Sequence, residues 1–193
     1  MKKFELTAEY ETNIFGKKLF RIKALVAFGD VEEGDLGGFI EKESNLGNDG
    51  NAWVSGDAQV YGNARVSGDA RVSGDAQVYG NAQVYGNAQV SGDAQVYGDA
   101  QVYGNARVSG NARVSGDLDY ATVGGFGSEQ RTSTFFIRKD GAIGVICGCF
   151  CGTIEQFRAK VKETHKDSKY AQEYLMIADL MELHFAGGKD DER

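Results

Sequence analysis

The amino-acid sequence predicts an all-β solenoid that is followed by a small module of strands and helices. Two observations predict this fold: an exact six-residue repeat fills the middle of the chain, and the C-terminal part has a different composition without any repeat. The chain contains 27 glycines and no proline among 193 residues. This composition indicates one turn used many times, and it argues against collagen or a disordered linker.

The repeat reads Ala-x-Val-(Ser/Tyr)-Gly-(Asp/Asn) and begins at Ala52. A helix would need a spacing of 3.6 residues, whereas Ala and Val two residues apart share one face of a short strand. Gly followed by Asp or Asn is a turn signal. The repeat therefore predicts Ala and Val inside a coil and the intervening residues outside. The valines are Val54, Val60, Val66, Val72, Val78, Val84, Val90, Val96, Val102, Val108 and Val114.

The repeat resembles the hexapeptide-repeat family of left-handed parallel β-helices over about residues 36–123. In that family three hexapeptides make one triangular coil of 18 residues. Ile40 and Leu46 are predicted to be two earlier rungs, and residues 47–50 add two residues before the strict register begins. The resemblance implies about four coils, with an N-terminal β cap over residues 1–35 and a C-terminal ββαα module over residues 124–193.

An 18-residue coil arranges the outward residues in ladders of like side chains. Stacked Tyr and Gln ladders stabilise parallel coils without any ligand, and this is the simpler interpretation. The alternative is an aromatic face that is used for self-association or for a ligand, since tyrosine can stack on a base and arginine can bind phosphate. The candidate ligand-binding residues are Tyr61, Tyr79, Tyr97, Tyr85, Tyr103, Arg65, Arg71, Arg107 and Arg113.

Both ends of the solenoid are predicted to carry other secondary structure. Residues 4–7 and 18–25 read as two strands around a turn near Gly16. Residues 133–138 and 142–147 read as a hairpin, because Lys-Asp-Gly separates them.

Two helices are predicted to follow this hairpin. Thr153 with Gln156 forms a capping box for the first, and Asp167 or Ser168 caps the second. The second helix is apolar beyond one stripe, so burial on more than one side is expected. Its predicted inner face is Tyr170, Tyr174, Ile177, Ala178, Met181 and Phe185.

Metal binding is weighed and not favoured. Cys147, Cys149 and Cys151 alternate, so we expect them on one face of a single strand, packed against the helices. Together with His165 or His184 they could bind zinc, but they lack the usual C-x₂₋₄-C spacing. One Asp per coil at 57, 75 and 93 is more simply turn chemistry than a calcium site. No cofactor is expected, and clustered cysteines of odd number favour a reducing cytoplasm.

Catalysis is also not favoured. The hexapeptide family includes acyltransferases that use a histidine on or near a coil and carbonic anhydrases that need three coil histidines, whereas this repeat contains none. A hexapeptide-type acyltransferase remains a minor alternative. Ice binding is disfavoured because the ladders are not rich in threonine. Mimicry of DNA is weakened because residues 52–117 carry four arginines against six aspartates. The net charge of −7 argues against direct nucleic-acid binding, and neither a signal peptide nor a membrane-spanning run is evident.

The overall layout resembles uncharacterised β-helix proteins of phages and prophages, through residues 34–43 and through the tail at 147–153 that precedes residues 162–165. The hypothesis is a phage-encoded, non-catalytic homotrimer in the cytoplasm of the bacterial host. It would sequester a small nucleotide-type host signal or block a host defence protein. The alternative is a purely structural oligomerisation scaffold.

Overall fold

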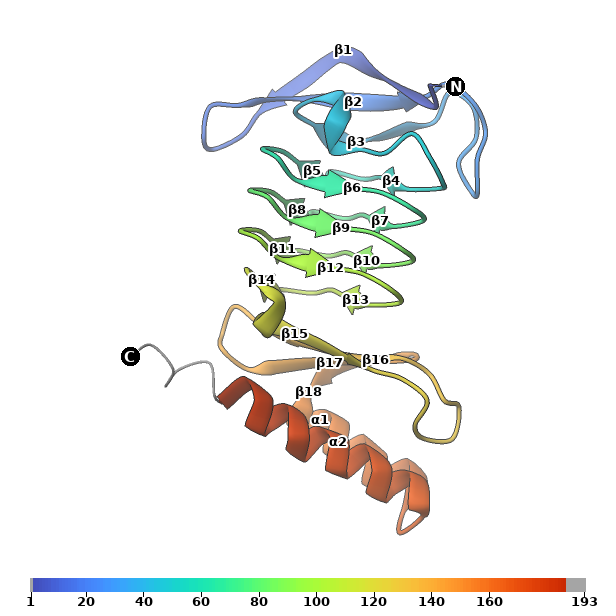
Figure 1. Cartoon of the computed structure of the whole chain (residues 1–193), viewed down its shortest axis with the longest axis vertical. Coiled ribbons are helices and arrows are strands. Elements are labelled where there is room, and N and C mark those ends of the chain that lie inside the picture. Colours follow the sequence, from blue (N-terminus) through green and yellow to red (C-terminus); the bar gives the residue numbers. More distant parts are fainter. Residues whose placement is uncertain (1, 187–193) are drawn as a thin grey trace. The chain divides into compact units, whose positions relative to one another are not determined.

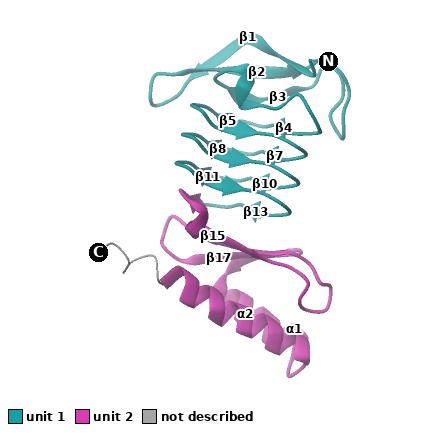
Figure 2. Cartoon of the chain, in the orientation of Figure 1, with its two compact units in different colours: residues 1–111 teal, residues 112–193 magenta. Residues whose placement is uncertain are grey.

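The computed structural model describes residues 2–186 and contains two compact units, Met1–Asn111 and Ala112–Arg193 (Figures 1 and 2). The first unit is a parallel β-solenoid beneath an N-terminal β cap. The second contains a four-stranded sheet that is followed by two helices. The predicted fold class is therefore confirmed, with about four turns of solenoid. The three-part division at residues 35 and 123 stays a prediction.

The solenoid is built from strands of two residues, each of which pairs in parallel with the strand three rungs later. Val54 pairs with Val72, and Val60 with Val78, so the coil has the predicted 18 residues. Ile40 pairs with Val60 and Leu46 bridges to Val66, which confirms both early rungs. The first sheet contains β4 (Trp53–Val54), β7 (Arg71–Val72), β10 (Gln89–Val90) and β13 (Arg107–Val108); the second contains β5 (Gln59–Val60), β8 (Gln77–Val78) and β11 (Gln95–Val96); the third contains β6 (Arg65–Val66), β9 (Gln83–Val84) and β12 (Gln101–Val102).

The interior of the solenoid contains the valines and alanines of the repeat. Every one of these valines is fully buried, and the alanines are at most 1 % exposed. Burying a valine side chain contributes about 1.5–3 kcal/mol, so the buried valines supply much of the stability of the coils.

Each corner of the solenoid depends on a glycine. The corner glycines from Gly56 to Gly110 have φ between +63° and +73°, where residues with a Cβ are strained. Equivalent corners of successive coils also approach closely: a Cβ on Gly74 would lie 3.0 Å from the amide nitrogen of Gly92. Glycine adopts this backbone without strain and adds no atom at the close approach.

The N-terminal cap covers the first coil. β1 (Phe4–Thr12) and β2 (Lys18–Ala24) form the predicted antiparallel pair, and β3 (Leu36–Ile40) joins β2 to the second sheet. Lys3 is buried and donates to the carbonyl oxygens of Gly50 and Ala52 at 3.2 and 2.8 Å. Burial lowers the pKa of Lys3 to about 8. The cap thus satisfies carbonyl groups that would otherwise be open at the end of the solenoid.

The sheet of the second unit has the order β15-β16-β17-β18 and is antiparallel throughout. β16 and β17 are the predicted hairpin, whereas β15 and β18 were not predicted. Thr153 caps α1 in a reciprocal capping box with Gln156, and Ser168 rather than Asp167 accepts from the amide of Ala171 ahead of α2. The elements of this unit are β14 (Arg113–Val114), β15 (Tyr120–Val123), β16 (Ser133–Ile137), β17 (Ile143–Cys147), β18 (Phe150–Thr153), α1 (Ile154–His165) and α2 (Lys169–Ala186).

The expectation that three cysteines share one strand is wrong. β17 ends at Cys147, and β18 begins at Phe150 and contains Cys151. Between them Gly148 has φ +60°, as the first central residue of a type II′ turn requires. Cys147 is half-buried, whereas Cys149 and Cys151 are exposed.

One side of α2 packs into the core of the second unit and the other does not. Tyr174, Ala178 and Met181 are buried as predicted, but Tyr170 is 43 % exposed. The second apolar stripe, Met176, Leu180 and Leu183, is exposed in the single chain. Within residues 2–186, no helix has the length and apolar character needed to cross a bilayer.

Val84→Asp should unfold the solenoid, because it places an unpaired carboxylate in an interior that water does not reach. Gln83→Asp is the matched control, since Gln83 is the neighbouring residue and is exposed. Circular dichroism and urea unfolding measure the difference. A soluble, cooperatively folded Val84→Asp protein would show that Val84 does not point inward.

Gly74→Ala should lower the free energy of unfolding by at least about 1–2 kcal/mol, the cost of a left-handed backbone for a residue with a Cβ. The close approach to Gly92 adds to this cost. Ser73→Ala is the control on the adjacent outward position. Equal urea midpoints for the two variants would contradict the importance of the corner geometry.

Candidate functional site

Three tyrosines form a continuous stack beside the second sheet. The ring centroids of Tyr61 and Tyr79 are 5.0 Å apart with an interplanar angle of 2°, and those of Tyr79 and Tyr97 are 5.2 Å apart at 8°. Phe15, in the loop between β1 and β2, packs against Tyr61 with a ring-centroid distance of 6.3 Å and an interplanar angle of 46°. Tyr61 is only 4 % exposed, so the N-terminal end of this stack is covered by the cap.

Two tyrosines form a shorter stack beside the third sheet. The centroids of Tyr85 and Tyr103 are 5.3 Å apart with an interplanar angle of 13°, and Tyr103 is 51 % exposed. On the other side of Tyr85 the ladder continues with small residues. The preceding coil has Ser67 at this position, and Gly47 lies against Ser67. The aromatic ladder therefore begins abruptly at Tyr85.

Among the candidate arginines, only Arg65 lies on the same sheet as this second stack. It heads the outward column that continues with Gln83 and Gln101, and it is exposed. The hydroxyl of Tyr85 donates to Oε1 of Gln101 at 3.2 Å, which links the column to the stack. Arg65, Tyr85 and Tyr103 thus share one face of the solenoid.

The other arginines are dispersed. Arg71 forms an ion pair with Asp30 of the N-terminal cap, and burial lowers its pKa. Arg71 and Arg107 belong to the first sheet, where β10 separates their strands. Arg113 belongs to β14 in the second unit. The nine candidate residues therefore do not form one site.

Sequence reasoning missed the side-chain ladders at the corners on both sides of the third sheet. Asn81 accepts from Asn63 at 3.2 Å and donates to Asp99 at 2.9 Å. At the next corner Asn51 donates to Asp69 at 2.8 Å. The Asn and Asp residues that recur every 18 positions after a corner glycine were the available signal.

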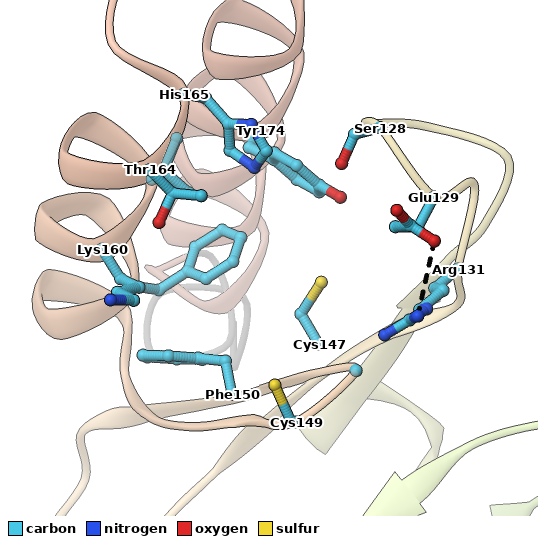
Figure 3. Close-up of a pocket in the computed structure, with 13 residues that line it drawn as sticks. Ser128, Glu129, Arg131, Cys147, Cys149, Phe150, Lys160, Thr164, His165 and Tyr174 are labelled. Atoms are coloured by element: carbon cyan, nitrogen blue, oxygen red, sulfur yellow. Dashed lines mark hydrogen bonds and ion pairs between the residues drawn. The ribbon is translucent and has the colours of Figure 1, made fainter.

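The second unit contains a cavity of about 260 Å³, which Figure 3 shows in close-up. Phe150, Phe157 and Tyr174 line it together with the thiol of Cys147, and Arg131 lies at its edge. Burial raises the pKa of Tyr174, and the neighbouring Cys147 raises it further. His165 and Cys149 also contact the cavity. Nevertheless, over residues 2–186 no three His, Cys, Asp or Glu side chains are placed to hold a metal ion.

A family model described as the YdcK β-solenoid repeat matches five stretches of the chain, at residues 58–74, 64–80, 76–92, 82–98 and 100–116. The solenoid is similar to the YdcK β-solenoid repeat. The match is confined to the repeat and includes neither the N-terminal cap nor α1 and α2. No curated protein matches the chain. The resemblances to the hexapeptide-repeat family and to phage proteins stay predictions.

Tyr61 should titrate late. Burial raises its pKa to about 12, and the neighbouring Tyr79 adds to the effect. An unfolded chain releases this proton near pH 10, while the folded chain keeps it. Folding stability should therefore fall as pH rises from 10 to 12, because the unfolded state then binds fewer protons.

The measurement is ultraviolet titration of tyrosinate together with urea unfolding across this pH range. Tyr61→Phe should remove the component near pH 12 and flatten the loss of stability. Tyr97→Phe is the control on the same ladder. If Tyr61→Phe left both curves unchanged, the burial of Tyr61 would be wrong.

Proposed function

We propose that this chain is a non-catalytic binding protein whose third sheet face holds a small nucleotide-type ligand. The observation that carries the proposal is the abrupt start of the aromatic ladder at Tyr85, next to Ser67 and on the same face as Arg65. A ligand ring at the Ser67 position would continue the ladder by one step.

Stacking supplies the first part of the binding energy. Aromatic side chains bind nucleobases through their ring faces, at about 1–3 kcal/mol per base. One face of Tyr85 is covered by Tyr103, and the adjacent position toward the N-terminus carries only Ser67 and Gly47. The hydrogen bond from Tyr85 to Gln101 holds the ring in orientation before any ligand arrives.

Charge supplies the second part. Arg65 is exposed and has no ion-pair partner among residues 2–186. A guanidinium group forms two parallel hydrogen bonds with a phosphate. Arg71 is less suited to this role, because its side chain is partly buried where it pairs with Asp30 of the N-terminal cap. The pairing of Arg65 with Tyr85 therefore fits a ligand that combines a base with a phosphate.

A non-catalytic role is supported by the chemistry of the coils. Their outward residues are Ser, Tyr, Gln, Arg, Asn, Asp and a single Trp, so a histidine base is not available there. In the finer form of the proposal, a phage-encoded homotrimer sequesters a nucleotide signal in the cytoplasm of a bacterial host, or blocks a host protein directly. Residue type and family resemblance support this setting.

A purely structural scaffold is the second candidate. The Tyr61–Tyr79–Tyr97 stack favours it, because that stack is covered at one end and stabilises the coils without a ligand. On that account the solenoid serves assembly, and neither tyrosine ladder binds a small molecule.

Isothermal titration against cyclic and ADP-ribose-type nucleotides tests the proposal. Tyr85→Ser and Arg65→Gln should each weaken binding about tenfold or more, since each removes the stacking or the phosphate contact. Both substitutions introduce a residue that the repeat already carries at an equivalent position, so the fold should persist.

Tyr97→Ser and Arg107→Gln are the matched controls on the other two sheets, and they should leave binding unchanged. Native mass spectrometry on the same samples counts subunits and detects a bound ligand. If no nucleotide binds, or if all four variants weaken binding equally, the third face is not the binding site and the scaffold account is favoured.

A further inference from the structure

The cavity of the second unit has aromatic walls that belong to its hydrophobic core. Phe157 packs edge-on against Tyr174 at 5.7 Å and lies 5.5 Å from Phe150. Phe157 and Tyr174 are buried, at 3 % and 7 % exposure. Since the core fixes these rings, the apolar part of the cavity exists before any ligand binds.

The loop between β15 and β16 forms another wall. Gly127 lies directly against the Tyr174 ring, where a Cβ would overlap it, and the Gly127 amide donates to Glu173 at 2.8 Å. Gln130 in the same loop has φ +51°, which is unusual for a residue with a side chain. Gln130 lies between Glu129 and Arg131, the two charged residues that this loop places at the cavity.

The hairpin between β17 and β18 contacts Arg131 at the cavity. A Cβ on Gly148 would lie 2.7 Å from Nη1 of Arg131, so the guanidinium group rests directly against the turn. Arg131 forms an ion pair with Glu129 at 3.4 Å, and its side chain is 55 % exposed. A guanidinium group has five N–H donors, so this ion pair leaves donors for a bound anion.

Cationic groups predominate at the cavity. Besides Arg131, it is lined by Lys160, and Glu129 is the single acid among the lining residues. Figure 3 shows Glu129 and Arg131 on one side of the cavity and Lys160 with Phe150 on the other, with Cys147 between them. An apolar interior with a cationic edge suits an amphipathic anion.

The volume limits the size of that anion. About 260 Å³ lies just below the ~300–1,000 Å³ typical of sites for drug-sized ligands. A single ring with a carboxylate fits such a space, whereas a dinucleotide is far too large.

We propose that this cavity binds a small monocyclic aromatic carboxylate, with its ring among Phe150, Phe157 and Tyr174 and its carboxylate at Arg131. The site is separate from the third sheet face of the solenoid and draws all its residues from the second unit. The aromatic carboxylate proposed for the cavity is smaller than a nucleotide and carries no phosphate.

Protection of a thiol tests this site directly. Cys147 lines the cavity and Cys151 does not, so the two report on the same protein as probe and internal reference. The full chain carrying Cys149→Ser is alkylated with iodoacetamide, and tandem mass spectrometry measures the ratio of labelling at the two sites. Benzoate should slow the labelling of Cys147 severalfold at saturation and leave that of Cys151 unchanged. Benzamide, its neutral isostere, should require at least about tenfold higher concentration, since it lacks the charge-assisted pairing with Arg131.

Variants separate the role of charge from that of shape. Arg131→Gln should weaken protection by benzoate about tenfold and leave the effect of benzamide unchanged, and Arg131→Lys should restore part of the loss. Arg138→Gln is the control, because Arg138 belongs to the same unit and does not line the cavity. Thermal unfolding confirms that each variant is folded. Equal protection by benzoate and benzamide, or none by either at their solubility limits, would overturn the proposal.

Discussion

The contact between glycines of successive coils is the constraint on which the rest of the solenoid depends. Each corner needs a positive φ, and from Gly56 to Gly92 a Cβ on the corner glycine would lie only 3.0–3.2 Å from the backbone of the glycine 18 residues later. With the corners held at this distance, the strands fall into hydrogen-bonding register and the valines stack in one column on each of the three sheets. Outward side chains of successive coils then lie next to one another, which is why tyrosines, glutamines and asparagines form ladders.

The two units offer binding surfaces of different origin. On a regular solenoid surface, one position differs from the equivalent positions of other coils only where a ladder changes residue type, as it does between Ser67 and Tyr85. The cavity of the second unit arises instead from segments without periodicity: a loop, a hairpin and two helices. The first surface is open and suits a ligand that adds to an existing stack. The second is partly enclosed, and selects a ligand by size and charge.

Periodicity explains how much the sequence could predict. Coil length, inward valines and the early rungs at Ile40 and Leu46 all follow from one frame, and the structure confirms them. Local capping rules likewise located both helices. Features that join segments far apart in the sequence could not be predicted from periodicity or from local capping rules. The ion pair between Asp30 and Arg71 and the cavity beside Cys147 depend on tertiary packing. The hairpin at Gly148 was missed because alternating cysteines imitate a strand, whereas the single glycine between two of them marks a turn.

The two-residue excess before Ala52 shows where the coil tolerates an irregularity: at its capped end, ahead of the strict register. Within the repeat, the solenoid should tolerate insertions and deletions only in certain lengths. A genetic insertion or deletion of 18 codons would add or remove one full coil and leave every ladder on its own face. A change of six codons would keep every valine inside but shift each later tyrosine to the neighbouring face, so the order of surface residues would change while the core stayed intact. Natural variation in the length of such solenoids should therefore follow steps of whole coils wherever a face has a function.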